Sequence, residues 1–157
     1  MGLRHLAAAA LLCFFLSSMA FAEAPDRPGT QDRCPVCGMF VSPFPNWISL
    51  VQFQDGSAVY FDGPKDMFTY LENLPKYRAD SSSGEASGVF ATEYYSTRLM
   101  KAADLLFISG SDVLGPMGNE LVPVAGQEQA ETFKRDHGGN KILRFDGKNL
   151  VEFLPNQ

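Results

Sequence analysis

Residues 47–64 read WISLVQFQDGSAVYFDGP. Two runs rich in β-branched and aromatic residues, 47–53 and 57–61, stand on either side of Asp55-Gly56. An Asp-Gly pair between two such runs is the strongest short signal for a β-hairpin, because the tight turn needs residues that tolerate positive φ. The stretch therefore predicts two antiparallel strands.

The same stretch ends on the start signal of a helix. Pro64 suits the first turn, and Asp62 or Gly63 can cap it, while Pro75 ends the helix. Apolar side chains follow at helical spacing and are expected in the core: Met67, Leu71 and Leu74, with Phe68 beside them. Residues 78–88 are small and polar and predict a mobile loop, and residues 89–95 predict a further strand.

The second half of the chain repeats this order. Its predicted elements are strands at 104–109 and 121–124, a helix at 127–137 stopped by Gly138, and strands at 141–145 and 150–153 joined by Asp146-Gly147. The order strand, strand, helix, strand thus occurs twice. We predict an α+β fold, one domain over residues 34–157, made of two small ββαβ units (about 34–98 and 99–157) packed together.

The first 22 residues have the layout of a cleavable secretory signal. Arg4 and His5 precede an apolar run over 6–15, and small residues occupy the positions before a cut after Ala22. The run is short for a membrane anchor. Leu12 before Cys13 is too large for a lipobox, so no lipid anchor is expected. Residues 23–33 are rich in proline, glycine and charge and predict a flexible leader.

The composition excludes several classes of function. The chain has 157 residues, 45% hydrophobic and 20% charged, which is a globular balance rather than a disordered one. Its net charge is −5 and it has no basic run, so binding to nucleic acid is not expected. No Ser/His/Asp arrangement and no glycine-rich phosphate loop is evident, and we expect no enzyme.

The densest group of chemically versatile residues is Cys34-Pro35-Val36-Cys37-Gly38-Met39. Four interpretations of its two thiols stay open. A zinc site would need a further Cys or His pair, and beyond residue 22 the chain offers only His137. A thioredoxin-like redox pair normally lies between a strand and a helix, which the pattern here does not predict. A structural disulfide suits an oxidising compartment. A Cu(I) site is the fourth interpretation, since thiolate and thioether donors together select this ion.

Two methionines and one histidine are the remaining candidates for metal ligands. Met39 lies two residues after a cysteine, so its sulfur can reach the same ion, although most methionines only fill gaps in a core. Met117 lies in a Gly-Pro turn, where a methionine buries poorly. His137 lies near the end of a predicted helix, where the helix dipole already favours an imidazolium.

Several motifs, taken in order, resemble the NosL family, whose members are exported copper-binding accessory proteins linked to nitrous oxide reductase maturation. The motifs are Cys37-Gly38-Met39, Phe61-Asp62-Gly63, Gly110-Ser111-Asp112, Gly115-Pro116-Met117-Gly118 and His137-Gly138-Gly139. The resemblance covers about residues 34–145. It implies a fold of two ββαβ units similar to a domain of organomercurial lyase.

The resemblance also implies a function and its residues. By position, the copper-binding cysteine of the family falls on Cys37 and its distal methionine on Met117, with Met39 in the same motif. Cys34 adds a second thiol that not all relatives have, so a disulfide or two-thiolate copper binding becomes available, and His137 completes the candidate set. We expect a periplasmic chaperone for Cu(I) that serves a cuproenzyme, nitrous oxide reductase by analogy, together with copper-delivery proteins. The alternatives are a thiol-disulfide protein using Cys34 and Cys37 in the same maturation, and an interaction module with a structural disulfide.

Overall fold

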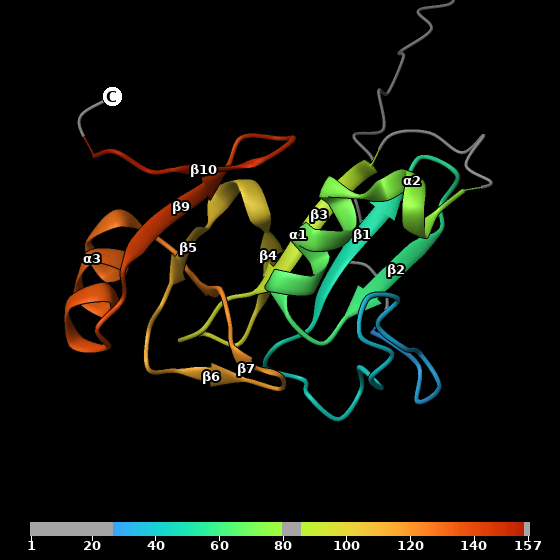
Figure 1. Ribbon diagram of the computed structural model, residues 1–157, viewed down its shortest axis with the longest axis horizontal. Helices are drawn as coiled ribbons and strands as arrows, with labels where there is room; N and C mark the ends of the chain where they lie inside the picture. Colours follow the sequence, from blue (N-terminus) through green and yellow to red (C-terminus); the bar gives the residue numbers. More distant parts are fainter. Residues whose placement is uncertain (1–26, 80–85, 156–157) are drawn as a thin grey trace, which may run out of the picture.

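The computed structural model describes residues 27–79 and 86–155, and its first half forms a four-stranded sheet with a helix on one face (Figure 1). Strands β1 (Ser49–Phe53) and β2 (Ala58–Phe61) make the predicted hairpin. Helices α1 (Pro64–Glu72) and α2 (Leu74–Tyr77) follow, then β3 (Ala86–Thr92) and β4 (Leu99–Lys101). All neighbouring strands are antiparallel, in the order β2-β1-β3-β4.

The second half has the same plan. After a 3-10 turn, η1 (Ala102–Asp104), come β5 (Leu106–Ser109), β8 (Val122–Val124), α3 (Gln127–Asp136), β9 (Lys141–Phe145) and β10 (Leu150–Glu152). Their order, β8-β5-β9-β10, matches that of the first sheet. A small hairpin of β6 (Leu114–Gly115) and β7 (Gly118–Asn119) is inserted between β5 and β8. The α+β class is confirmed. Each unit has a fourth strand at the sheet edge and is ββαββ: β10 corresponds to the strand predicted at 150–153, whereas β4 has no predicted counterpart.

Several local predictions differ from the structure or lie outside the described residues. Pro75 does not end the helical segment, because α1 ends at Glu72 and Pro75 lies in the first turn of α2. The strand predicted over 89–95 ends at Thr92. The loop predicted over 78–88 is wrong for its last three residues, because β3 begins at Ala86 and pairs there with β1. The short strand β4 was not predicted, and it carries the first sheet to Lys101. The secretory signal and the first residues of the leader, 23–26, lie outside the described residues. In the part of the chain that is described, no helix is long and apolar enough to span a bilayer.

Helix α1 lies between the two sheets, so the molecule is layered as sheet, helix, sheet, helix (Figure 1). Towards its own sheet α1 presents Tyr70, whose ring lies 5.2 Å from that of Phe61, and the fully buried Met67. Towards the second sheet it presents Phe68, with ring centroids 5.0 Å from Phe107 and 5.5 Å from Phe145. The other face of the second sheet packs against α3. The predicted core position of Met67 is confirmed.

Two buried glutamates join the units. Glu120, which precedes β8, accepts the backbone N–H of Lys65 at the start of α1, with an N···O distance of 2.7 Å. Glu93, in the β3–β4 turn, accepts the N–H of Ser96 at 2.7 Å and that of Ala125, just before α3, at 3.4 Å. Each unit thus sends a carboxylate to the region where the helix of the other unit begins.

The two glutamates have pKa values shifted in opposite directions. Burial raises the pKa of Glu120 to about 7, although the N–H groups of Leu121 and Lys65 act against the rise. For Glu93, burial alone would raise the pKa, but hydrogen bonds from Ser96 and from the backbone hold it below its usual value. Of these two glutamates, Glu120 is therefore the one whose charge changes in the folded protein as the pH approaches neutral.

We predict that the free energy of unfolding depends on Glu120 between pH 5 and pH 7. In this window the folded state holds a proton that the unfolded state has lost, so stability falls as the pH rises, by about 1.4 kcal/mol per unit at most. Urea unfolding of the reduced, metal-free Glu120→Gln variant should lack this fall, since the amide keeps an acceptor and no charge. Glu93→Gln is the control and should keep it. Parallel curves for wild type and Glu120→Gln would contradict the assignment.

Candidate metal site

The two cysteines lie in a tight loop between Arg33 and Phe40. The N–H of Cys34 donates to the carbonyl of Met39 at 2.9 Å, and the N–H of Gly38 donates back to the carbonyl of Cys34 at 2.8 Å. Gly38 has φ +79°, which glycine adopts without strain. The Arg33 guanidinium donates to the Gly38 carbonyl and lies 3.6 Å from the centroid of the Phe40 ring. The loop is therefore closed by its own backbone and by Arg33, and both thiols are directed to one side.

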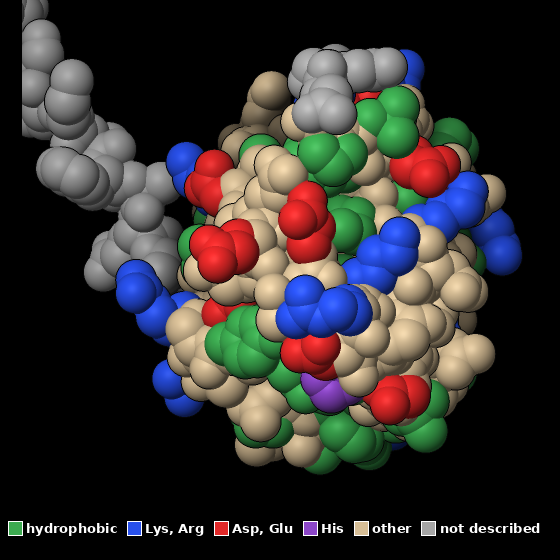
Figure 2. Space-filling model, turned by 90° about the vertical axis from the view of Figure 1, so that its left-hand side faces the viewer, with side chains coloured by type: hydrophobic (Ala, Val, Ile, Leu, Met, Phe, Trp, Pro, Cys, Tyr) green, Lys and Arg blue, Asp and Glu red, His purple; other side chains and the backbone are tan. Residues whose placement is uncertain are grey.

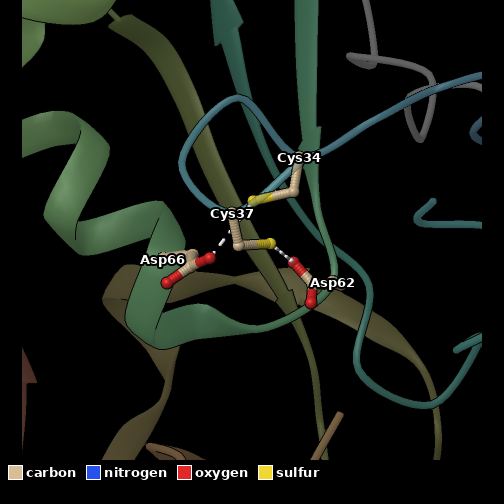
Figure 3. Close-up of side chains that lie close together, drawn as sticks. All are labelled: Cys34, Cys37, Asp62 and Asp66. Atoms are coloured by element: carbon tan, nitrogen blue, oxygen red, sulfur yellow. Dashed lines mark hydrogen bonds between the residues drawn. The ribbon is translucent and has the colours of Figure 1, made fainter. Parts of the chain in front are cut away.

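Two carboxylates from the start of α1 meet these thiols (Figure 3). The Cys37 thiol donates to Asp62 Oδ1 at 3.2 Å, and the Cys34 thiol donates to Asp66 Oδ2 at 3.3 Å. One potential ligand atom from each of the four residues lies within 4.8 Å of the other three. Cys34, Asp62 and Asp66 are buried, whereas Cys37 is half-buried. The site is thus open on the side of Cys37.

The local sequence explains why Asp62 is free to face a thiol. Gly63 is the residue before the first helical position, and no side chain within the helix caps it. Asp62 was one of the two caps predicted, but its carboxylate turns to Cys37 instead. The N–H of Lys65 in the first turn has no acceptor within the helix, and it donates instead to Glu120 of the other unit. Capping across the units therefore releases Asp62 for the site.

Both cysteines are free thiols, and their surroundings keep them protonated. Burial raises the pKa of Cys37 to about 11, since it outweighs the stabilising backbone hydrogen bond from Met39. Burial raises the pKa of the more deeply placed Cys34 further still. At neutral pH the site therefore holds two S–H groups, each hydrogen-bonded to a carboxylate, and a metal ion that binds the sulfurs must displace both protons.

The donor set fits a thiophilic ion. Two sulfurs and two carboxylate oxygens within one small cluster suit a soft or borderline cation, which takes thiolates as ligands once they are deprotonated. The carboxylates add hard donors and negative charge, and this charge attracts any cation that approaches. The geometry therefore supports metal binding, with Cys34 and Cys37 as the sulfur donors.

The two candidate methionines occupy different positions relative to the thiols. Met39 belongs to the cysteine loop itself and closes it through its carbonyl, and its side chain is half-buried. Met117 lies at the turn of the β6–β7 hairpin and is 48% exposed, as expected for a Gly-Pro turn. The hairpin ends beside the start of α1, where Lys65 Nζ donates to the carbonyl of Asn119 at 2.6 Å (Figure 1).

His137 is not brought together with the cysteines. It follows α3 directly, with Nδ1 2.9 Å from Asp112 Oδ1 and its ring stacked on Phe133 at 4.4 Å. Helix α3 forms the outermost layer of the second unit, and the cysteine loop lies against the first unit (Figure 1). Figure 2 shows the α3 end of the molecule, where acidic and basic side chains alternate with small hydrophobic patches. The histidine already has a partner on that surface.

Sequence reasoning missed Asp62 and Asp66 as members of the site. Both lie at the predicted helix start, Asp62 just before the cap residue Gly63 and Asp66 in the first turn of α1. The hydrogen-bonded pairs are nevertheless 25 and 32 residues apart in sequence. Only the packing of the cysteine loop on the α1 start makes these aspartates neighbours of the thiols.

We predict that a thiophilic ion releases about two protons on binding at pH 7, because both thiols are protonated in the metal-free protein and must ionise. Silver(I) added to the reduced protein in a weakly buffered solution with a pH indicator measures the release. Cys34→Ser and Cys37→Ser should each reduce it to about one proton. Release that is unchanged in either variant would exclude that sulfur as a ligand.

Comparison with known proteins bears on the fold and the family. A crystal structure of the copper chaperone NosL from Shewanella denitrificans superposes with a TM-score of 0.65 at 21% sequence identity, covering 85% of this chain and 98% of that one. The match shows a shared fold. A search of curated protein sequences gives no match. The family model of NosL matches residues 25–148, which is most of the chain and includes both cysteines, both aspartates and Met117. The protein therefore belongs to the NosL family.

Proposed function

We propose that the protein is an exported metallochaperone that binds Cu(I) and delivers it to a cuproenzyme, with nitrous oxide reductase as the client. The observation that carries the proposal is the pair of free thiols, Cys34 and Cys37, held together at one partly open site. Family membership and the copper chaperone with the same fold support copper as the cargo. The proposal is for binding and transfer without a catalysed reaction, in line with that relative being a chaperone.

The chemistry of the donors favours the monovalent ion. Cu(I) prefers two or three soft ligands, and two thiolates with a thioether from Met117 or Met39 meet this preference. Asp62 and Asp66 are harder donors than the sulfurs. Their proposed role is to accept hydrogen bonds from the two thiols before copper binds. Export to the periplasm is part of the proposal and is supported by the signal-like residues 1–22. Copper-delivery proteins are the proposed source of the ion.

A thiol-disulfide function for the same cysteines has less support. A redox pair needs an accessible thiolate, which attacks a substrate disulfide, and a second thiol to resolve the mixed disulfide. Cys34 is only 1% exposed, and burial raises the pKa of both thiols instead of lowering it. These features suit metal binding better than disulfide exchange.

We expect the reduced protein to bind one Cu(I), and we expect the two cysteines to contribute unequally. Anaerobic competition with a colorimetric Cu(I) chelator measures the affinity. Cys37→Ser should lose most of it, because Cys37 lies at the open side, whereas Cys34→Ser should keep measurable binding. If both variants bind copper as the wild type does, the chaperone proposal fails. If both variants bind copper normally and neither supports the client enzyme in cells, the result would favour the thiol-disulfide function.

The aspartates should discriminate between metals. Zinc(II) accepts carboxylate oxygen as a ligand, whereas Cu(I) prefers sulfur. The double substitution Asp62→Asn with Asp66→Asn keeps the shapes of the side chains and removes the charges. Its affinity for zinc(II) should fall at least about tenfold, while its affinity for Cu(I) should change less than about threefold. Equal losses for both metals would show that the carboxylates bind copper directly.

A further inference from the structure

Glu120 fills a space that two glycines leave between the units. Gly63 precedes α1 in the first unit, and Gly115 ends β6 in the second. A Cβ atom on Gly63 would collide with Oε2 of Glu120. One on Gly115 would lie 2.9 Å from both Cβ and Cγ of Glu120, closer than side chains tolerate. Glu120 itself is 7% exposed. Two motif glycines, one from each unit, thus make room for one carboxylate.

The hydrogen bonds of this carboxylate join the inserted hairpin to α1. Its Oε1 accepts the N–H of Lys65 at 2.7 Å and the N–H of Leu121 at 2.9 Å. The side chain of Lys65 makes a second hydrogen bond to this region, since its Nζ donates to the carbonyl of Asn119. Lys65 is the neighbour of Asp66, and Asn119 lies two residues after Met117. The end of the hairpin and the helix start that carries the site are therefore joined by two hydrogen bonds, both from Lys65.

The hairpin needs such support. Its two strands pair at two positions, Leu114↔Asn119 and Gly115↔Gly118. A ladder this short is marginal by itself in water, so its orientation depends on what it packs against. Among the contacts of the described residues, those of Glu120 and Lys65 are the ones that join it to the first unit by hydrogen bonds.

We propose that Glu120 is a positioning residue of the metal site, which holds the hairpin 114–119 against the start of α1 and so presents Met117 to an ion bound by Cys34 and Cys37. The inference rests on the proposed function, in which Met117 supplies a thioether. Glu120 touches no ion in this arrangement. It acts through Lys65 and through the two glycines.

The first test needs no metal. Hydrogen exchange of the reduced, metal-free protein reports the opening of residues 114–119. In Glu120→Ala the exchange of these amides should speed up at least about tenfold relative to the rest of the second sheet. Glu120→Gln keeps an acceptor for the Lys65 N–H and should stay near wild type. Glu93→Ala is the matched control, since it removes the other buried glutamate between the units and should leave the hairpin protected. An unchanged hairpin in Glu120→Ala would overturn the proposal.

The second test asks whether the contribution of Met117 depends on Glu120. Met117→Leu should lower the Cu(I) affinity about tenfold in the wild type, in Glu120→Gln and in Glu93→Ala, and less than twofold in Glu120→Ala. Glu120→Asp keeps the charge but withdraws the carboxylate from Lys65, and it replaces Glu120→Ala if that variant does not fold, with the same expected result.

The outcomes separate the two proposals. A full effect of Met117→Leu in Glu120→Ala, or the loss of this effect in Glu93→Ala as well, would overturn the positioning role. So would a Met117→Leu substitution without effect in the wild type, although copper binding through the cysteines would then keep the proposed function. A wild type that binds no Cu(I) would overturn both.

Discussion

The burial of Phe68 between two sheets is the contact on which the rest of the structure depends. Its ring packs on Phe107 and Phe145 of the second sheet, while Tyr70 and Met67 on the same helix pack on the first. Full burial of a phenylalanine stabilises a fold by about 1.5–3 kcal/mol, and here that stabilisation also fixes α1 from two sides. The start of α1 therefore has a defined position relative to both units. Both carboxylates of the metal site lie at that fixed helix end.

Elements with strong local signals were predictable from the sequence, and elements that depend on a partner were not. The Asp55-Gly56 hairpin and the helix start at Pro64 carry their own turn and cap chemistry, and both are found where expected. Strand β4 has three residues and exists because β3 offers it an open edge. The β6–β7 hairpin is shorter still. Nothing in such short segments distinguishes them from loops before the fold is formed.

The site was predictable to a similar extent. The motif around Cys34 and Cys37 predicted two of the four residues that the candidate site brings together, because both cysteines lie in one short segment. The two aspartates required knowledge of where the cysteine loop packs. The sequence predicts Asp62 or Gly63 as the cap of α1, and capping is the ordinary role of an aspartate there. Asp62 is released from that role by Glu120, a residue 55 positions away from the Lys65 that it contacts. Capping from another unit leaves no local trace in the sequence.

The two units share a strand order but have diverged in what surrounds their helices. At the start of α1 the chain carries Asp62-Gly63-Pro64, and at the equivalent place before α3 it carries Ala125-Gly126-Gln127. The first unit thus has carboxylates and the cysteine loop at its helix start. In the second unit Ala125 stands where the first has Asp62, and the inserted hairpin lies between the first two strands of its sheet. In the described part of the chain, the first unit carries the candidate metal donors, and the second unit contacts the start of its helix through Glu120.

The unequal depth of the two thiols has a consequence for how cargo leaves. Cys34 is 1% exposed and Cys37 is half-buried, so the side chain of a recipient protein can approach an ion in this site only from the side of Cys37. Under the proposed function, the bond from the ion to Cys37 is the first to be replaced by a donor of the recipient, and the bond to Cys34 is the last to break. The ion then stays bound to one protein or the other throughout. Transfer becomes a stepwise exchange of ligands with a fixed order, and the depth of one cysteine determines that order.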